Sequence, residues 1–226
     1  MKDSTKQKIK EILKTILPGV ITLGINLFCY MVPKQIVPPE RYVFLDMEID
    51  RQIPMIPWFI IFYFLAFPQW ANYYLQACFG NKKLRNIYFS GDIMAKFVIF
   101  FIFAVFWPLA ADRPVIDNPQ NIWEWVISVT FAVDNPLGCF PSLHCFYSWL
   151  SFRYSYDVEP KGRRWITWLQ FALSMAVFAS TVLVKQHYFI DIPGGIAFAE
   201  IFLQIARNTK APDIFGRAMD KLTEKI

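Results

Sequence analysis

Residues 165–191 read WITWLQFALSMAVFASTVLVKQHYFID, and this stretch determines how the rest of the chain is interpreted. Its first 20 residues contain no charged side chain, and a helix of about 20 apolar residues crosses a bilayer. The apolar run ends at Lys185, and His187 and Asp191 follow at once. Ionisable side chains are costly beside hydrocarbon, so they indicate function. We therefore predict a membrane helix with a functional site at its end.

Five more apolar blocks of similar length accompany this one. The six blocks lie at about 12–32, 57–79, 92–111, 140–156, 165–184 and 188–206. The chain is 55% hydrophobic and only 18% charged, which is more apolar surface than a globule of 26.5 kDa can hide. We predict an all-α integral membrane protein, with residues 1–226 forming a single transmembrane domain built as a six-helix bundle.

The basic residues orient this bundle. The segments before the first block, between blocks two and three, between blocks four and five, and after block six, together with Lys14 and Arg153 at the adjoining block ends, hold 17 of the 23 lysines and arginines. Basic residues concentrate on the cytoplasmic side, so both termini are predicted to be cytoplasmic. His144 and His187 then face outside, in the plasma membrane. The basic residues lie in short loops and not in one patch, so no nucleic-acid partner is predicted.

Two shorter segments also have helical patterns. Residues 121–127 contain Trp123 and Trp125 and are too short to span, which favours an interfacial or re-entrant helix over a plain loop. Residues 207–226 place apolar side chains at helical spacing with basic residues between them. This pattern predicts a short amphipathic cytoplasmic tail on the inner leaflet, with a disordered tail as the alternative.

His144 and His187 are the only histidines, and their chemistry suits proton transfer near neutral pH. His187 and Asp191 are four residues apart, a spacing that places both on one face of a helix. The carboxylate can accept a hydrogen bond from one ring nitrogen, which leaves the other as a nucleophile or base. The alternative is that each histidine is an ordinary hydrogen-bonded residue at a helix end.

His144 belongs to the segment Pro141-Ser142-Leu143-His144. Proline in the first turn starts a helix, whose free N–H groups and dipole favour an anion. Ser142 adds a donor, and His144 on the same turn can give a proton. The segment predicts a place that holds a phosphate and protonates its leaving group, with a plain capped helix start as the alternative.

Arg113 follows the block at 92–111 and is the only arginine near the outer ends of the last four blocks. A guanidinium can bind two phosphate oxygens at once. We therefore predict that Arg113 binds phosphate, and the alternative is an interfacial arginine.

These three pieces, in this order, resemble the motifs of the type 2 phosphatidic acid phosphatase superfamily. That family carries Lys-x6-Arg-Pro, then Pro-Ser-Gly-His, then Ser-Arg-x5-His-x3-Asp. The chain has Phe106 to Pro114, Pro141 to His144, and Ser180 to Asp191 at these places. The resemblance covers about residues 92–206, which we take as the catalytic part.

The resemblance implies a role for each residue. His187 is the nucleophile that forms a phosphohistidine, Asp191 orients it, and His144 protonates the leaving oxygen. Ser142 and Arg113 bind the phosphate. The family needs no metal or other cofactor, and the sequence shows no cluster of carboxylates or cysteines with metal-ligand spacing.

Two departures from the motifs bear on the substrate. Phe106 stands where the family has its lysine, and Thr181 where it has the arginine of the last motif. The loss of two cations favours a phosphate of lower charge, such as a phosphodiester. The chain thus leans toward the branch that resembles inositol phosphorylceramide synthase and sphingomyelin synthase, which pass a phospho-headgroup between lipids. Lys185, two residues before His187, is a candidate replacement for a lost cation.

The predicted function is a membrane-embedded lipid phosphoesterase, either a phosphatase or a phospho-headgroup transferase. Its substrate would be a phospholipid or polyprenyl phosphate, with a lipid alcohol as acceptor in the case of transfer. One alternative is a catalytically silent family member that binds lipids or acts as a scaffold. Another is a haem or metal protein that uses His144 and His187 as ligands. The lipid tail and headgroup stay open, because apolar linings select between tails weakly.

Overall fold

The computed structural model describes residues 2–45, 47–160 and 163–225. Within them the chain forms helices and no strand, apart from the isolated bridges Val43–Leu109 and Ala110–Leu137. The α-helices are α1 (Lys2–Ile36), α2 (Glu48–Gln52), α3 (Ile60–Phe79), α4 (Lys82–Phe101), α5 (Ile122–Val133), α6 (Leu143–Val158), α7 (Arg164–Leu183), α8 (Asp191–Arg207) and α9 (Ala211–Thr223). Three short turns of other helical types complete them: η1 (Pro39–Arg41), η2 (Pro57–Phe59) and η3 (Ile102–Phe106), which continues α4.

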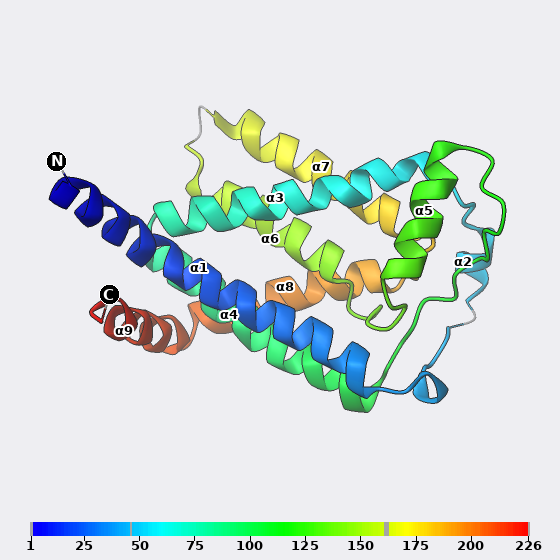
Figure 1. Cartoon of the computed structure of the whole chain (residues 1–226), viewed down its shortest axis with the longest axis horizontal. Helices are drawn as coiled ribbons and strands as arrows, with labels where there is room; N and C mark the ends of the chain where they lie inside the picture. The colour runs from blue at the N-terminus through cyan, green and yellow to red at the C-terminus, as the bar shows by residue number, and fades with distance from the viewer. Residues whose placement is uncertain (1, 46, 161–162, 226) are drawn as a thin grey trace.

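Helix α6 lies among its neighbours and packs against α3, α7 and α8, while α4 packs against α1 and α8 (Figure 1). Aromatic side chains such as Tyr73, Phe89, Phe146 and Tyr154 fill the space between them. This arrangement confirms the all-α prediction for the described residues.

Among the described residues, three helices are long and apolar enough to cross a membrane, namely Thr5–Ile36, Lys82–Phe106 and Arg164–Leu183. They correspond to the first, third and fifth predicted spans. Helices α3, α6 and α8 coincide with the other three blocks, but their crossing of the membrane, and with it the six-helix bundle, stays a prediction.

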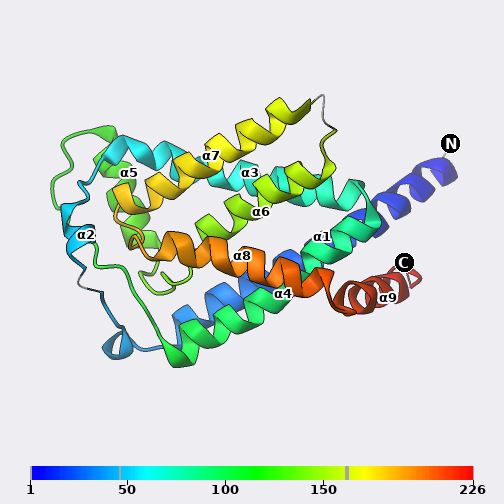
Figure 2. The same cartoon turned by 180° about the vertical axis from the view of Figure 1, so that it is seen from behind.

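Both termini lie at the same end of the molecule, and α2, α5 and the turn between α7 and α8 lie at the opposite end (Figures 1 and 2). The shared end agrees with the predicted shared side of the two termini. That this side is cytoplasmic remains a prediction.

Two predicted helix starts are wrong, and the third predicted span ends at Phe106 and not at Ala111. The first helix begins at Lys2 and not near residue 12, and the third begins at Lys82 and not at Asp92. In both cases the helix includes a basic segment that the sequence analysis assigns to a loop, because lysine and arginine are good helix formers. The α3–α4 connection is only Gly80 and Asn81, and the Asn81 side chain caps α4 by accepting from the Leu84 amide.

Both shorter segments form helices. Helix α5 confirms the predicted helix after residue 121, although its place at a membrane interface stays a prediction. Helix α9 confirms helix in the tail, but Phe215 and Met219 are buried in the protein core and do not face lipid as expected. They pack there because α9 folds back against α4. Ile214 and Leu222 remain exposed.

Candidate active site

His187 lies in the turn between α7 and α8, and hydrogen bonds hold that turn. The backbone amides of Gln186 and His187 both donate to the carbonyl oxygen of Thr181, at 3.0 and 3.1 Å. Lys185 has a left-handed backbone with φ of 57°, which an α-helix cannot contain. Helix α7 therefore ends before Lys185, and α8 begins only at Asp191. The expectation that His187 and Asp191 share one helix is wrong.

Asp191 nevertheless contacts the His187 ring. His187 Nδ1 lies 3.1 Å from Asp191 Oδ2 and 3.2 Å from the carbonyl oxygen of Cys139. Both neighbours are acceptors, so we assign the ring proton to Nδ1. The lone pair is then on Nε2, which lies 3.3 Å from Ser142 Oγ. The structure thus brings together three of the predicted site residues.

Close packing of α8 on the start of α6 joins the two motifs. The Ser142 amide donates to the carbonyl oxygen of Asp191 at 3.3 Å. A Cβ atom at Gly195 would lie only 2.6 Å from the carbonyl oxygen of Ser142, so this approach requires glycine. Asp191 itself is fully buried, and its Oδ2 also accepts from the Tyr188 amide at 2.9 Å. The carboxylate that orients the ring is therefore held rigidly.

Ser142 caps α6, because its side chain accepts from the Cys145 amide at 3.3 Å. Helix α6 begins at Leu143, so Pro141 precedes the cap and does not occupy the first turn as predicted. The Ser142 hydroxyl hydrogen remains available for His187 Nε2 or for a ligand oxygen.

His144 lies in the first turn of α6 with its ring against aromatic side chains of α3. The ring stacks on Tyr63 with centroids 4.0 Å apart and meets Trp70 edge-on at 4.9 Å. Its centroid is 6.0 Å from that of His187. His144 Nε2 is buried and has no hydrogen-bond partner among the described residues. A buried nitrogen without a hydrogen-bond partner is costly, so this atom lacks an interaction that the described residues do not supply.

Arg113 lies beside the same site but already has partners. Its guanidinium donates to the carbonyl oxygen of Asp134 at 2.6 Å, to the Asp134 carboxylate at 3.3 Å, and to the Gln186 side chain. Gln186 is the residue before His187. Arg113 Nε is buried and has no partner in the described part of the chain. The structure thus places Arg113 next to the histidine turn, as a phosphate ligand would have to be.

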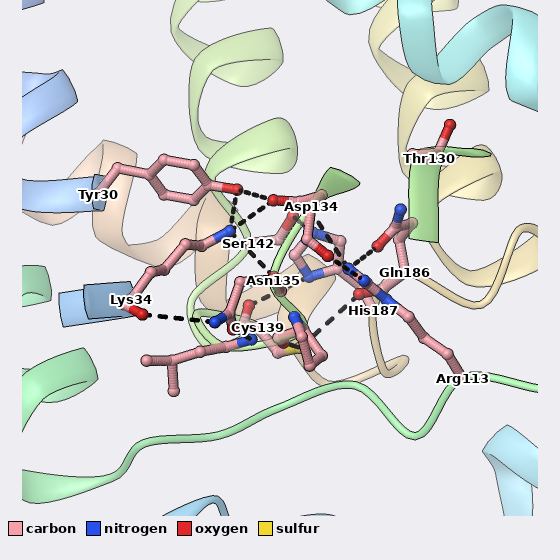
Figure 3. A network of polar contacts seen from close by, with 12 residues as sticks. Tyr30, Lys34, Arg113, Thr130, Asp134, Asn135, Cys139, Ser142, Gln186 and His187 are labelled. Atoms are coloured by element: carbon pink, nitrogen blue, oxygen red, sulfur yellow. Dashed lines mark hydrogen bonds and ion pairs between the residues drawn. The ribbon is translucent and has the colours of Figure 1, made fainter. Parts of the chain in front are cut away.

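Two charged residues of the site were not predicted. Lys34, near the end of α1, contacts Asp134 Oδ1 at 2.7 Å, and Asp134 follows the last residue of α5. Lys34 also donates to the Tyr30 hydroxyl and to the carbonyl oxygen of Asn135. Figure 3 shows Lys34, Asp134 and Arg113 beside Ser142 and His187. We call Lys34, Arg113 and Asp134 the outer cluster.

Lys185 has different partners from those predicted. Its ammonium group donates to the carbonyl oxygens of Asp50 and Ile53, in and after α2. Burial lowers the pKa of Lys185, and the Asp50 carboxylate partly offsets this. Within the described residues it makes no hydrogen bond to Ser142 or His187, so its role as a phosphate ligand stays a prediction.

The two positions that depart from the family motifs, Phe106 and Thr181, differ in their exposure. Phe106 is 76% exposed at the end of η3. Thr181 is fully buried beneath the turn, and its hydroxyl donates to the carbonyl oxygen of Phe178. Neither position supplies a charge to the site, and Lys34, which does lie beside it, is outside the family motifs.

Cys139, His187 and Asp191 form a group that the sequence did not reveal. One ligand atom from each lies within 4.8 Å of the others, a spacing that a metal ion can use. Burial raises the pKa of the Cys139 thiol well above its usual range, and the Asp191 carboxylate adds to this. The thiol donates to the carbonyl oxygens of Pro136 and Gln186. A metal would have to displace that proton, so these contacts fit a structural role for Cys139.

A groove of about 470 Å³ opens beside Arg113, between residues 111–116 and α5. Phe44, Phe131 and Pro136 make much of its wall apolar. A larger hollow of about 790 Å³ lies near Gly80 and Tyr154, at the far end from both histidines. Of these two hollows, only the groove beside Arg113 is lined by a residue of the predicted site.

On an all-helical scaffold, the structure thus brings together a buried histidine bound to a carboxylate, a second histidine at a helix start and a neighbouring arginine. The model of the PAP2 superfamily matches residues 53–205, and the chain belongs to that superfamily. Its members are generally phosphatases or phosphotransferases that act on lipid phosphates. No curated protein and no solved structure matches the chain.

Proposed function

We propose that this protein is a lipid phosphoesterase that works through a phosphohistidine on His187. Nε2 attacks the phosphorus, and the bond from phosphorus to the leaving lipid oxygen breaks. His144 gives that oxygen a proton. Water or a lipid alcohol, deprotonated by His144, then attacks the phosphohistidine and frees Nε2. Water as acceptor gives a phosphatase, and a lipid alcohol gives a headgroup transferase.

One observation carries the proposal: both partners of His187 Nδ1 are acceptors, at 3.1 and 3.2 Å. They fix the tautomer whose Nε2 lone pair faces Ser142. When Nε2 bonds to phosphorus the ring becomes positive, and the buried Asp191 carboxylate stabilises that charge. His144 has no such carboxylate, so it suits the role of acid.

The phosphate oxygens would be held by the Ser142 hydroxyl, by the free amides at the start of α6, and by Arg113. The N-terminus of a helix favours an anion, and α6 begins directly at the histidine pair. We propose further that the site faces the outside of the plasma membrane, since the basic segments cluster at the other end. The substrate is a phospholipid or polyprenyl phosphate, and the chain follows the branch that resembles inositol phosphorylceramide and sphingomyelin synthases.

The test is acid-labile phosphate on the protein after a rapid quench with labelled phosphatidic acid, a polyprenyl phosphate or phosphatidylinositol. Wild type is expected to trap phosphate, with EDTA present or absent, and His187→Ala to trap none. His144→Ala should slow the trapping of lipids most and that of an activated aryl phosphate least, because the aryl group leaves without a proton. Trapping by His187→Ala but not by His144→Ala reverses the roles. No trapping and no vanadate-sensitive turnover in wild type favours the silent, lipid-binding alternative.

A further inference from the structure

The Asp134 carboxylate lies between two cations that come from distant parts of the chain. Its Oδ1 lies 2.7 Å from Lys34 Nζ of α1, and its Oδ2 lies 3.3 Å from Arg113 Nη2. The Lys34 and Arg113 side chains are 7% and 10% exposed, and that of Asp134 is 29% exposed. Two cations that each contact one oxygen of a carboxylate would contact two oxygens of a phosphate in the same way.

The outer cluster is physically connected to the nucleophile. Arg113 donates to the side chain of Gln186, which directly precedes His187. On the other side, one loop runs from Asp134 to Ser142, and its Cys139 carbonyl oxygen contacts His187 Nδ1 at 3.2 Å. Figure 3 shows this network as continuous from Lys34 to His187. The two cations are therefore placed to act on a group bound at His187.

The charges of the outer cluster add up to a single positive charge, because Asp134 offsets one of the two cations. A phosphodiester carries one negative charge near neutral pH, which this balance matches. A phosphomonoester has a second pKa of about 6 and is mostly a dianion at pH 8. The Asp134 carboxylate would repel the second negative charge of the monoester, and the outer cluster holds no third cation to neutralise that charge.

We propose that Asp134 is a specificity-determining residue, which makes the site favour monoanionic phosphodiesters over dianionic phosphomonoesters. Lys34 is the cation that compensates for Phe106 and Thr181, and Asp134 limits how much charge it adds. This inference rests on the proposed function and names the substrate class for the same site. It also accounts for a feature that a simple phosphate pocket would avoid, a carboxylate between its cations.

The experiment compares two substrates that share a leaving group, p-nitrophenyl phosphate and methyl p-nitrophenyl phosphate, in detergent micelles at pH 8. The quantity measured is the ratio of kcat/KM for the diester to kcat/KM for the monoester. Asp134→Asn keeps the shape and removes the charge, so the ratio should fall about 10-fold or more, the scale of one close charge contact. Lys34→Gln removes a cation and should raise the ratio.

Asp117→Asn is the matched control, because it makes the same change at an exposed site between Arg113 and α5, and its ratio should equal that of wild type. An unchanged ratio in Asp134→Asn, or a wild type that hydrolyses only the monoester, overturns the inference while the proposed function stands. If Asp134→Asn fails to fold, Lys34→Gln decides: a raised ratio supports the inference, and an unchanged one overturns it. A wild type with neither turnover nor phosphoenzyme removes the proposed function itself.

Discussion

Two clusters of buried charge among the described residues differ in balance and access. The outer cluster has two cations and one carboxylate, retains some exposure, and borders a groove of about 470 Å³. The second place is a pair one turn apart on α4, Asp92 and Lys96, which we call the core pair. Their side chains are 0% and 1% exposed, and Lys96 Nζ lies 3.6 Å from Asp92 Oδ1.

The core pair is neutral as a unit, and its neighbours are part of the fold. Asp92 accepts from the Tyr74 hydroxyl at 2.8 Å, from Asn26 at 3.2 Å and from the Tyr147 hydroxyl at 3.1 Å. Lys96 Nζ lies 3.6 Å from the centre of the Phe146 ring. These contacts join α1, α3, α4 and α6.

The comparison shows that buried charge alone does not mark a site in a membrane-type bundle. An ionisable residue beside hydrocarbon indicates function by default, and that rule selects both places equally. Unbalanced charge next to a groove and next to a nucleophile distinguishes the outer cluster. Charge that is balanced and sealed between helices fits a structural role, so the core pair should affect stability and the site should affect rate.

The largest expected effect is on stability, at the core pair. Lys96→Met leaves the Asp92 carboxylate buried without its cation, which should lower the free energy of unfolding by about 3–5 kcal/mol. Unfolding in mixed detergent micelles, followed by circular dichroism, measures this loss. Lys83→Met is the control, because Lys83 is an exposed lysine of the same helix, and it should change stability little.

Adding Asp92→Asn to Lys96→Met should restore part of the lost stability, since no unpaired charge then remains. If Lys96→Met keeps its stability but its folded fraction loses turnover, the core pair belongs to the catalytic machinery and the distinction between the two places fails.

The next largest effect is expected on the turnover rate, at Asp191, whose side chain is buried as fully as that of Asp92. Asp191→Asn should keep the acceptor for the Tyr188 amide but weaken the hold on His187 Nδ1 and the stabilisation of its positive charge. We expect turnover to fall by about 10²-fold or more and stability to fall less than in Asp92→Asn. Steady-state hydrolysis and unfolding of both variants measure the contrast. Equal effects of the two substitutions on both quantities would contradict it.

The helices and the histidine motifs could be predicted from the sequence because their signals are local. Apolar runs of membrane length located α1, α3, α4, α6, α7 and α8. The pairing of His187 with Asp191 was also predicted, although the reason given was wrong, because a turn and not a helix brings them together. The start of α4 was missed, since lysine and arginine in a first turn look like a loop.

The outer cluster could not be predicted, because it depends on contacts between distant segments. Lys34 and Asp134 are 100 residues apart in the chain, and no motif links them. One signal was present: Lys34 is a basic residue at the supposed outer end of the first span, against the trend of the other loops. It also lies four residues after Tyr30, whose hydroxyl contacts the same carboxylate at 3.1 Å.

The smallest expected effect is at Lys185, which tests whether a cation close in sequence to His187 belongs to the outer cluster. Among the described residues its ammonium donates only to the carbonyl oxygens of Asp50 and Ile53, so we expect it to tether α2 to the turn before His187. Lys185→Met should therefore lower kcat/KM by about fivefold or less, the scale of one exposed polar contact, and Lys185→Arg should restore most of it. Loss of a phosphate ligand would lower kcat/KM further, by about 10-fold or more.

Rates with both p-nitrophenyl substrates separate the two cases, because a tether changes both rates equally, whereas a phosphate ligand affects the dianionic monoester more. A fall beyond 10-fold, larger for the monoester and without loss of stability, would return Lys185 to the phosphate site.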